Sequence, residues 1–156
     1  MSEMTPRYWI VVGSPDNWER TADRGFTVQG LKSRHRKKAE LMHAGDKIIS
    51  YVTGTKAFAG ILTITSDYYE EHDNPIWVSG NAKKADEDYP FRVKVEKDVW
   101  LPTNGYVDAE PLARRIDYAK RYPEKNWTLA FQGNVHPISE SDFNIIRDAI
   151  DAAAAT

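Results

Sequence analysis

Apolar residues along this chain form short runs with the two-residue alternation of strands, separated by stretches with helical spacing. The run "YWIVV" at residues 8–12 predicts a buried strand. "DKIISYV" (46–52) and "AFAGILTITS" (57–66) predict two further strands, and the Gly-containing connection "TGTK" between them favours a hairpin. The segment "YPFRVKVEKDVWLP" (89–102) predicts a strand with two unlike faces, one carrying Phe91, Val93 and Val95 and the other Arg92, Lys94 and Glu96.

Helices are predicted where capping residues precede apolar positions spaced three or four apart. Ser14 is a good N-cap, Pro15 suits the first helical position, and Gly25 ends the short helix that follows. A second helix is expected from Ser33 to Met42, with Leu41 and Met42 turned inward because they share its remaining face.

Two more helices are expected towards the end of the chain. One spans residues 109–119, beginning near Pro111. The other is capped by Ser139, with Asp142 at the capping-box distance, and it turns one apolar face inward through Phe143, Ile146 and Ile150.

These elements predict the fold class. Helices lie among strands with hairpin signals and without a regular βαβ alternation, which favours an α+β fold with a curved or barrel-like mixed sheet of about six strands and three to five helices. The polar stretch 79–88 is expected to be a mobile loop, and "NWTLAF" (126–131) a strand or a short buried turn. No internal repeat or linker is visible, so one domain over residues 1–156 is expected, with its core at about 7–151.

Composition narrows the function classes. The chain has 41% hydrophobic and 28% charged residues, typical of a folded soluble domain, and a net charge of −2, so attraction to phosphate requires a local patch. Cysteine is absent, which excludes disulfides, thiolate metal sites and a cysteine nucleophile. The first residues lack a signal layout and no apolar run reaches membrane length, so a cytoplasmic location without membrane association is expected.

The sequence contains no recognisable catalytic motif. A phosphate-binding Gly-rich loop, GxSxG and HExxH are all missing, so we expect no catalytic residues, no cofactor and no metal. The acidic stretch 67–73 leaves a metal-dependent enzyme open as a weaker alternative. It contains Asp67, Glu70, Glu71, His72 and Asp73, which a solvated loop explains equally well.

Aromatic and basic residues provide the more informative pattern. Aromatic residues at the ends of several predicted strands are what a pocket for a planar base requires, because any base can stack on a π surface. The same residues also suit an ordinary core. The predicted helix beginning at Ser33 carries a dense basic run, which is either a phosphate-binding surface or a solvated helix face; the run consists of Lys32, Arg34, Arg36, Lys37 and Lys38.

Taken in order, several segments resemble a known family. "YWIVVGSPDNWE", "VQGL", the basic helix, "AGDKIISYV", "FAGILTITSDYY" and "YPFRVKV" are similar to the EVE domain, in particular its small stand-alone bacterial and archaeal members. The resemblance implies a PUA-like mixed pseudo-barrel flanked by helices, related to the YTH domains that hold a methylated adenine of RNA in an aromatic cage.

The resemblance further implies a module that binds nucleic acid, either RNA or modified DNA, through one base, which is expected to be modified. The residues expected to hold this base are Trp9, Asn17, Trp18, Phe26, Gln29, Gly30, Tyr51, Tyr89 and Arg92. The basic run, which follows the pocket loop, is expected to bind the flanking phosphates. The alternative is a protein that binds a free nucleobase or a similar planar small molecule in the same pocket.

One residue departs from the family pattern. Family members often place a tryptophan directly before the glycine of the pocket loop, whereas this chain has Gln29 before Gly30. A stacking surface is lost there, and the Gln29 amide can hydrogen-bond a base edge instead. The departure implies a shift in ligand preference.

Overall fold

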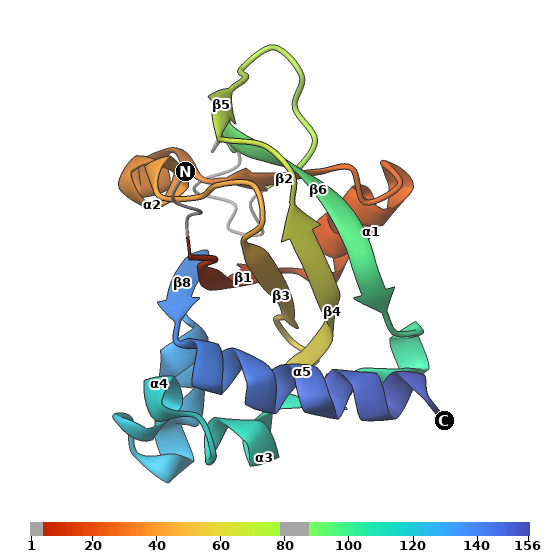
Figure 1. Cartoon of the computed structure of the whole chain (residues 1–156), viewed down its shortest axis with the longest axis vertical. Coiled ribbons are helices and arrows are strands. Elements are labelled where there is room, and N and C mark those ends of the chain that lie inside the picture. Colours follow the sequence, from red (N-terminus) through yellow and green to blue (C-terminus); the bar gives the residue numbers. More distant parts are fainter. Residues whose placement is uncertain (1–4, 79–87) are drawn as a thin grey trace.

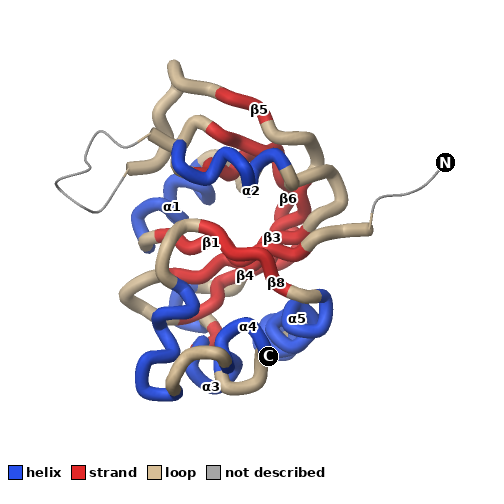
Figure 2. Tube along the Cα trace, turned by 90° about the vertical axis from the view of Figure 1, so that its left-hand side faces the viewer, coloured by secondary structure: helices blue, strands red, loops and turns tan. Residues whose placement is uncertain are grey.

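The computed structural model describes residues 5–78 and 88–156, and its strands form one mixed sheet with helices on both sides (Figures 1 and 2). Six strands follow one another in the order β2-β6-β4-β3-β1-β8, while the short β5 and β7 pair with β6 and β4. The strands are β1 (Tyr8–Gly13), β2 (Val28–Leu31), β3 (Lys47–Val52), β4 (Ala57–Ile64), β5 (Tyr69–Glu70), β6 (Phe91–Trp100), β7 (Val107–Asp108) and β8 (Val135–Ile138).

The sheet is curled rather than doubly wound. β1 and β3 run parallel, whereas the other described strand pairs are antiparallel. Register shifts interrupt the β3–β4 pair at Ser50/Tyr51 and the β4–β6 pair at Ile61/Leu62. Such irregularities increase local twist. The α+β expectation of a barrel-like mixed sheet is therefore confirmed.

Helices cover the two faces of the sheet in separate groups (Figure 2). The helices α1 and α2 lie on one side, and α3, α4 and α5 on the other. Their bounds are α1 (Pro15–Asp23), α2 (Arg36–Glu40), α3 (Ala109–Ala113), α4 (Asp117–Lys120) and α5 (Glu140–Ala154), with 3-10 segments at Ser33–His35, Thr103–Gly105 and Glu124–Phe131.

Alternation along β1 supplies both faces. Ile10 and Val12 belong to the apolar cluster shared with α3, α4 and α5, whereas Trp9 and Val11 belong to the cluster beneath α1 and α2. A strand places successive side chains on opposite faces, so this single strand contributes to both clusters.

Several local predictions are confirmed. The Ser14 hydroxyl accepts a hydrogen bond from the Asn17 backbone N–H at 3.1 Å, and Pro15 opens α1. The Ser139 hydroxyl caps α5 in the same way through the Asp142 N–H at 3.1 Å. On α5 the three predicted apolar residues, Phe143, Ile146 and Ile150, are buried.

Other predictions were wrong or incomplete. The helix expected over Ser33–Met42 is a 3-10 turn followed by α2, which ends at Glu40. Leu41 therefore lies beyond the helix and is 43% exposed, whereas Met42 is buried as expected. The helix expected at 109–119 is two short helices. Of the two structures expected for "NWTLAF", a strand and a short turn, the turn is confirmed: the segment is a 3-10 turn with Ala130 and Phe131 buried.

Two further expectations concern residues near β6. The polar loop expected at 79–88 lies outside the described residues except for Asp88. Arg92, expected on the polar face of its strand, is only 2% exposed because residues 74–77 cover it.

Asn134 connects the two end strands of the sheet. Its side-chain amide donates to the Val12 carbonyl at 3.1 Å and accepts from the Lys32 backbone N–H at 3.1 Å. The backbone carbonyl of Asn134 accepts a hydrogen bond from the Val12 N–H at 2.7 Å. One buried residue before β8 thus holds the end of β2 and the interior of β1.

We expect Ile146→Ala to lower the free energy of unfolding by about 2–5 kcal/mol, because it deletes a fully buried side chain and leaves a cavity. Urea unfolding measures this change. Asp151→Ala, at an exposed position of the same helix, is the control and should change stability by less than about 0.5 kcal/mol. Equal effects of the two substitutions would contradict the packing of α5.

Candidate functional site

The residues expected to hold a base lie in three different places. Trp9 is 1% exposed, and its indole N–H donates to the Asp46 carboxylate at 3.1 Å. The Tyr51 ring stacks on Phe131 with centroids 4.5 Å apart, and burial raises the pKa of Tyr51 to about 12. Both rings are packed within the fold, although Tyr51 also borders a cavity of about 320 Å³.

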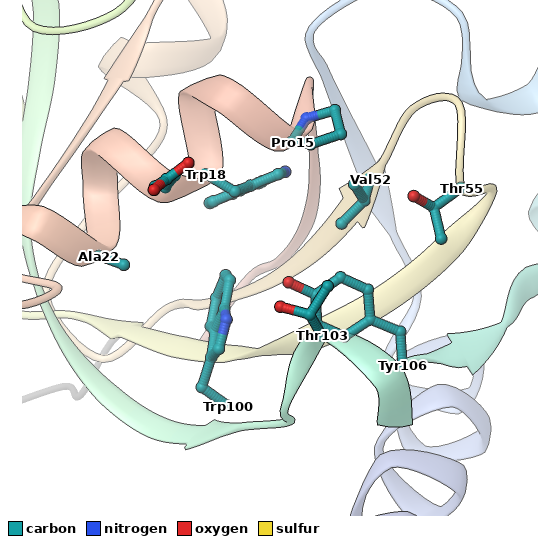
Figure 3. A pocket seen from close by; sticks show the side chains of 9 residues that line it. Pro15, Trp18, Ala22, Val52, Thr55, Trp100, Thr103 and Tyr106 are labelled. Carbon is teal, nitrogen blue, oxygen red and sulfur yellow. The ribbon is translucent and has the colours of Figure 1, made fainter.

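Trp18 lies beside an open cavity between α1 and the end of β6 (Figure 3), and Phe26 packs on another residue that lines this cavity, Trp100. Trp18 lines it, and its N–H is held by the Tyr51 carbonyl at 3.0 Å. The ring centroids of Phe26 and Trp100 lie 4.6 Å apart, and those of Trp100 and Trp18 lie 5.5 Å apart. This space of about 340 Å³, the Trp18 cavity, is lined by Pro15, Trp18, Glu19, Ala22, Val52, Thr55, Trp100, Thr103 and Tyr106.

The remaining expected residues gather around a residue that the sequence did not single out, Trp77. It is 4% exposed, although it lies in a segment without regular secondary structure. A Cβ added to Gly30 would lie 2.4 Å from the Trp77 ring, so the indole packs directly on the glycine backbone. We call this cluster the Trp77 site; the residues around the indole and the adjoining Val78 backbone are Asn17, Thr21, Gly30, Tyr89 and Arg92.

Polar groups of α1 hold the segment that carries Trp77. The Asn17 amide pairs with the backbone of Val78, donating to its carbonyl at 2.7 Å and accepting from its N–H at 2.9 Å. The Trp77 indole N–H donates to the Thr21 hydroxyl at 2.9 Å. Thr21 in turn donates to the Gln29 side-chain carbonyl at 3.1 Å, and the Gln29 amide donates to the Gly30 carbonyl at 3.2 Å.

Arg92 and Tyr89 border the same indole. The guanidinium carbon of Arg92 lies 5.2 Å from the Trp77 ring centroid, and the Tyr89 ring lies 6.1 Å from it. Arg92 donates to the Tyr89 carbonyl at 3.2 Å and to the Asn74 carbonyl at 2.5 Å. These bonds fix the guanidinium beside the indole, and burial lowers the pKa of Arg92.

The basic segment, residues 32–38, begins next to the Trp77 site. Arg34, Arg36 and Lys37 are exposed, as expected for this part of the chain. Lys38, which was expected to be exposed as well, is half-buried and donates to the Val135 carbonyl at 2.8 Å, which fastens α2 to β8. The Lys32 ammonium lies 5.9 Å from the Tyr89 ring centroid, so the run of cations starts at the border of the Trp77 site.

Two histidines, His35 within the basic segment and His136 beside Lys38, are held in the neutral form. Burial, followed by the positive charges of Lys38 and Arg34, lowers the pKa of His35 to about 4. Burial and then Lys38 lower the pKa of His136 to about 4. At neutral pH, Lys and Arg therefore supply the positive charge of this surface.

The acidic stretch 67–73 forms histidine–carboxylate pairs. His72 contacts Glu70 at 2.6 Å and Asp88 at 2.8 Å, and these hydrogen bonds raise the pKa of His72. His43 pairs with Asp67 at 3.0 Å. Within residues 5–78 and 88–156, no group of three or more His, Asp or Glu side chains is arranged to hold a metal ion.

Sequence reasoning missed Trp77, Thr21, Trp100 and Tyr106. Trp77 stands in the short apolar run "IWV" (76–78) between two polar stretches, and this run, too short to show a periodicity, was the only signal of its burial. Trp100 is the last residue of β6 and Tyr106 lies beyond it, where the alternation of apolar and polar residues no longer indicates which side chains turn inward.

A sequence model of the EVE domain family matches residues 7–149. The chain belongs to the EVE domain family. A comparison with curated proteins found no match.

Solved structures resemble this EVE domain in fold. Rpa0253 from Rhodopseudomonas palustris is 17% identical, with 94% of each chain covered and a TM-score of 0.58. The YTH domain-containing protein mmi1, solved with RNA, is 13% identical over 95% of this chain and 83% of that one, with a TM-score of 0.66. Human THYN1, solved with DNA containing 5-methylcytosine, is 17% identical over 91% and 96%, with a TM-score of 0.59.

These likenesses confirm the EVE and PUA-like expectation for the fold. The described part of this EVE domain includes no helix long and apolar enough to cross a membrane.

The two histidines predict a dependence of stability on pH. Their folded pKa of about 4 lies below the ordinary 6.5, so the unfolded chain binds more protons between these values and stability should fall as pH drops from 6.5 to 4. Because both side chains are partly exposed, we expect a loss on the order of 1 kcal/mol for each. Urea unfolding at pH 7 and pH 4.5 measures it. Carboxylates also titrate near pH 4, so a double variant, His35→Asn with His136→Asn, isolates the contribution and should lose distinctly less stability.

Proposed function

We propose that this EVE domain binds nucleic acid, with phosphates along the basic segment and one base at the Trp77 site. The observation that carries the proposal is the position of the cations. Five of the seven residues from Lys32 to Lys38 are Lys or Arg, in a chain of net charge −2, and the run begins where Lys32 approaches Tyr89. A local patch of this kind supplies the electrostatic attraction that the whole chain lacks.

Chemistry next to the patch supports a base site. Recognition of an unpaired base uses aromatic or guanidinium surfaces for stacking and amide groups for the base edge. The Trp77 site brings together such groups in Tyr89, Arg92 and Asn17. The structures of mmi1 with RNA and of THYN1 with 5-methylcytosine DNA support nucleic acid as the partner of this EVE domain as well. The role is one of binding, without a chemical step.

We expect Arg36→Ala with Lys37→Ala to weaken binding to single-stranded oligonucleotides and to flatten its salt dependence. Each phosphate contact contributes about 0.7 to the slope of log affinity against log salt on single strands, so the slope should fall by up to about 1.4. Fluorescence anisotropy at several salt concentrations measures this, with RNA and DNA strands, each with and without a methylated base.

Arg115→Ala with Lys125→Ala is the matched control. It also removes one exposed arginine and one exposed lysine, but in the segments that follow α3 and α4, and these two helices lie at the opposite end of the molecule from α2 (Figure 1). Both double variants should unfold at nearly the wild-type urea concentration, because exposed charges contribute little to stability. If the two variants have the same salt slope as the wild type, the basic segment is only a solvated surface.

A second candidate function is the binding of a free planar small molecule, and the Trp18 cavity favours it. Its volume of about 340 Å³ falls in the usual range for ligand pockets, about 300–1,000 Å³. Figure 3 shows Trp18 and Trp100 meeting at an angle beside it, with Tyr106 on a further side. Binding of a neutral ligand there should be nearly independent of salt, unlike binding of an oligonucleotide.

For this second function we expect Trp100→Ala to weaken binding of a free nucleobase or nucleoside by about 1–3 kcal/mol, the usual scale for a stacked base. Isothermal titration calorimetry measures the loss. Trp127→Ala removes another half-buried tryptophan outside the cavity and should leave the affinity unchanged. An unchanged affinity in Trp100→Ala would exclude the Trp18 cavity as the ligand site.

A further inference from the structure

We infer that Trp77 and the Val78 backbone occupy the base site of the free protein, and that the site takes a purine with the lactam edge of guanine. The inference rests on the proposed function, because it assigns the occupant and the ligand class of the same site. It starts from the register of β2 and β6, where Gly30 is paired with Arg92.

This register creates a space that suits a flat ring. Side chains of a cross-strand pair point to the same face of the sheet, so the missing side chain at Gly30 leaves a space beside the Arg92 guanidinium. Trp77 fills it, with ring atoms that would lie 2.4 and 2.7 Å from a Cβ at position 30. An indole is a planar bicyclic ring of the size of a purine, so the space has purine dimensions.

Hydrogen bonds define what the edge of that ring must offer. The Asn17 amide donates to a carbonyl and accepts from an N–H, both supplied by Val78. Thr21 gives its own proton to Gln29, so towards the ring its oxygen acts as an acceptor, and it accepts from the Trp77 N–H. The complement of this site is therefore one acceptor and two donors.

Guanine carries this set along one edge. Its O6 accepts, and its N1–H and N2 amino group donate. The Asn17 amide can donate to O6 and accept from N1–H, as it donates to the carbonyl and accepts from the N–H of Val78. The N2 amino group can then donate to the Thr21 hydroxyl, as the Trp77 indole N–H does. Inosine lacks the amino group, and adenine offers one donor and one acceptor in the opposite order. The expected preference is therefore guanosine, then inosine, then adenosine.

Occupation by the chain itself has a further consequence. A base that uses Gly30, Thr21 and Asn17 must displace Trp77, whose indole and neighbouring backbone satisfy the same groups. The apparent affinity of the wild type is reduced by the fraction of molecules in which the site is filled. Removing the Trp77 indole should therefore raise the apparent affinity of the site for a base.

The test uses Trp77→Ala and free nucleosides, which need no phosphate contact. We expect guanosine to bind this variant at least about tenfold more tightly than the wild type, since an internal competitor is removed. Inosine and adenosine should each bind roughly tenfold or more weakly than guanosine, the scale of one lost buried hydrogen bond. Adding Asn17→Ala should abolish the gain. Isothermal titration calorimetry reports all of these affinities.

Controls make each outcome decisive. Trp127→Ala should show no gain, and if Trp77→Ala does not fold by circular dichroism, Trp77→Leu takes its place because it keeps an apolar cover. The inference is overturned if the variant binds no nucleoside more tightly than the wild type, or binds adenosine as tightly as guanosine. Failure of the proposed function looks different, since it is the absence of salt-dependent oligonucleotide binding that responds to Arg36 and Lys37.

Discussion

The buried amide of Asn134 holds together the two ends of the sheet on which the rest of the structure depends. It satisfies the Val12 carbonyl and the Lys32 N–H at once, and leaving such buried groups unpaired costs about 1–3 kcal/mol each. The amide therefore keeps β2 close to the β1–β8 edge and maintains the curl between them. Because Lys32 opens the basic segment, the same contact determines where the run of cations leaves the sheet.

Helix α1 separates two regions of unlike chemistry. Towards β2 and β6 it presents Asn17 and Thr21, whose hydrogen bonds organise the Trp77 site next to the cations. Towards the end of β6 it presents Trp18 and Ala22 to an aromatic cavity whose lining includes no residue of the basic segment. A nucleic-acid strand suits the first region, because cations for phosphates and hydrogen-bonding groups for base edges lie next to each other there. A small planar molecule suits the second region.

Local signals predicted much of the fold and little of the site. The caps of α1 and α5, the β3–β4 hairpin and the inward residues of α5 follow from neighbouring residues and so were predictable. Helix α2 ends two residues early, which exposes Leu41, and β8 carried no strand signal. The burial of Trp77 could not be predicted, because it depends on the long-range pairing of Gly30 with Arg92.

The position of β1 in the sheet has a consequence for synthesis of the protein. β1 lies between β3 and β8, so Tyr8 pairs with Lys47 on one side and with Ile138 on the other. At about 5–20 residues per second, the ribosome delivers β8 on the order of ten seconds after β1. During that interval the apolar segment "YWIVV" lacks one of its two partners. The nascent chain is then exposed to aggregation through this strand edge, and chaperone binding at this segment would protect it.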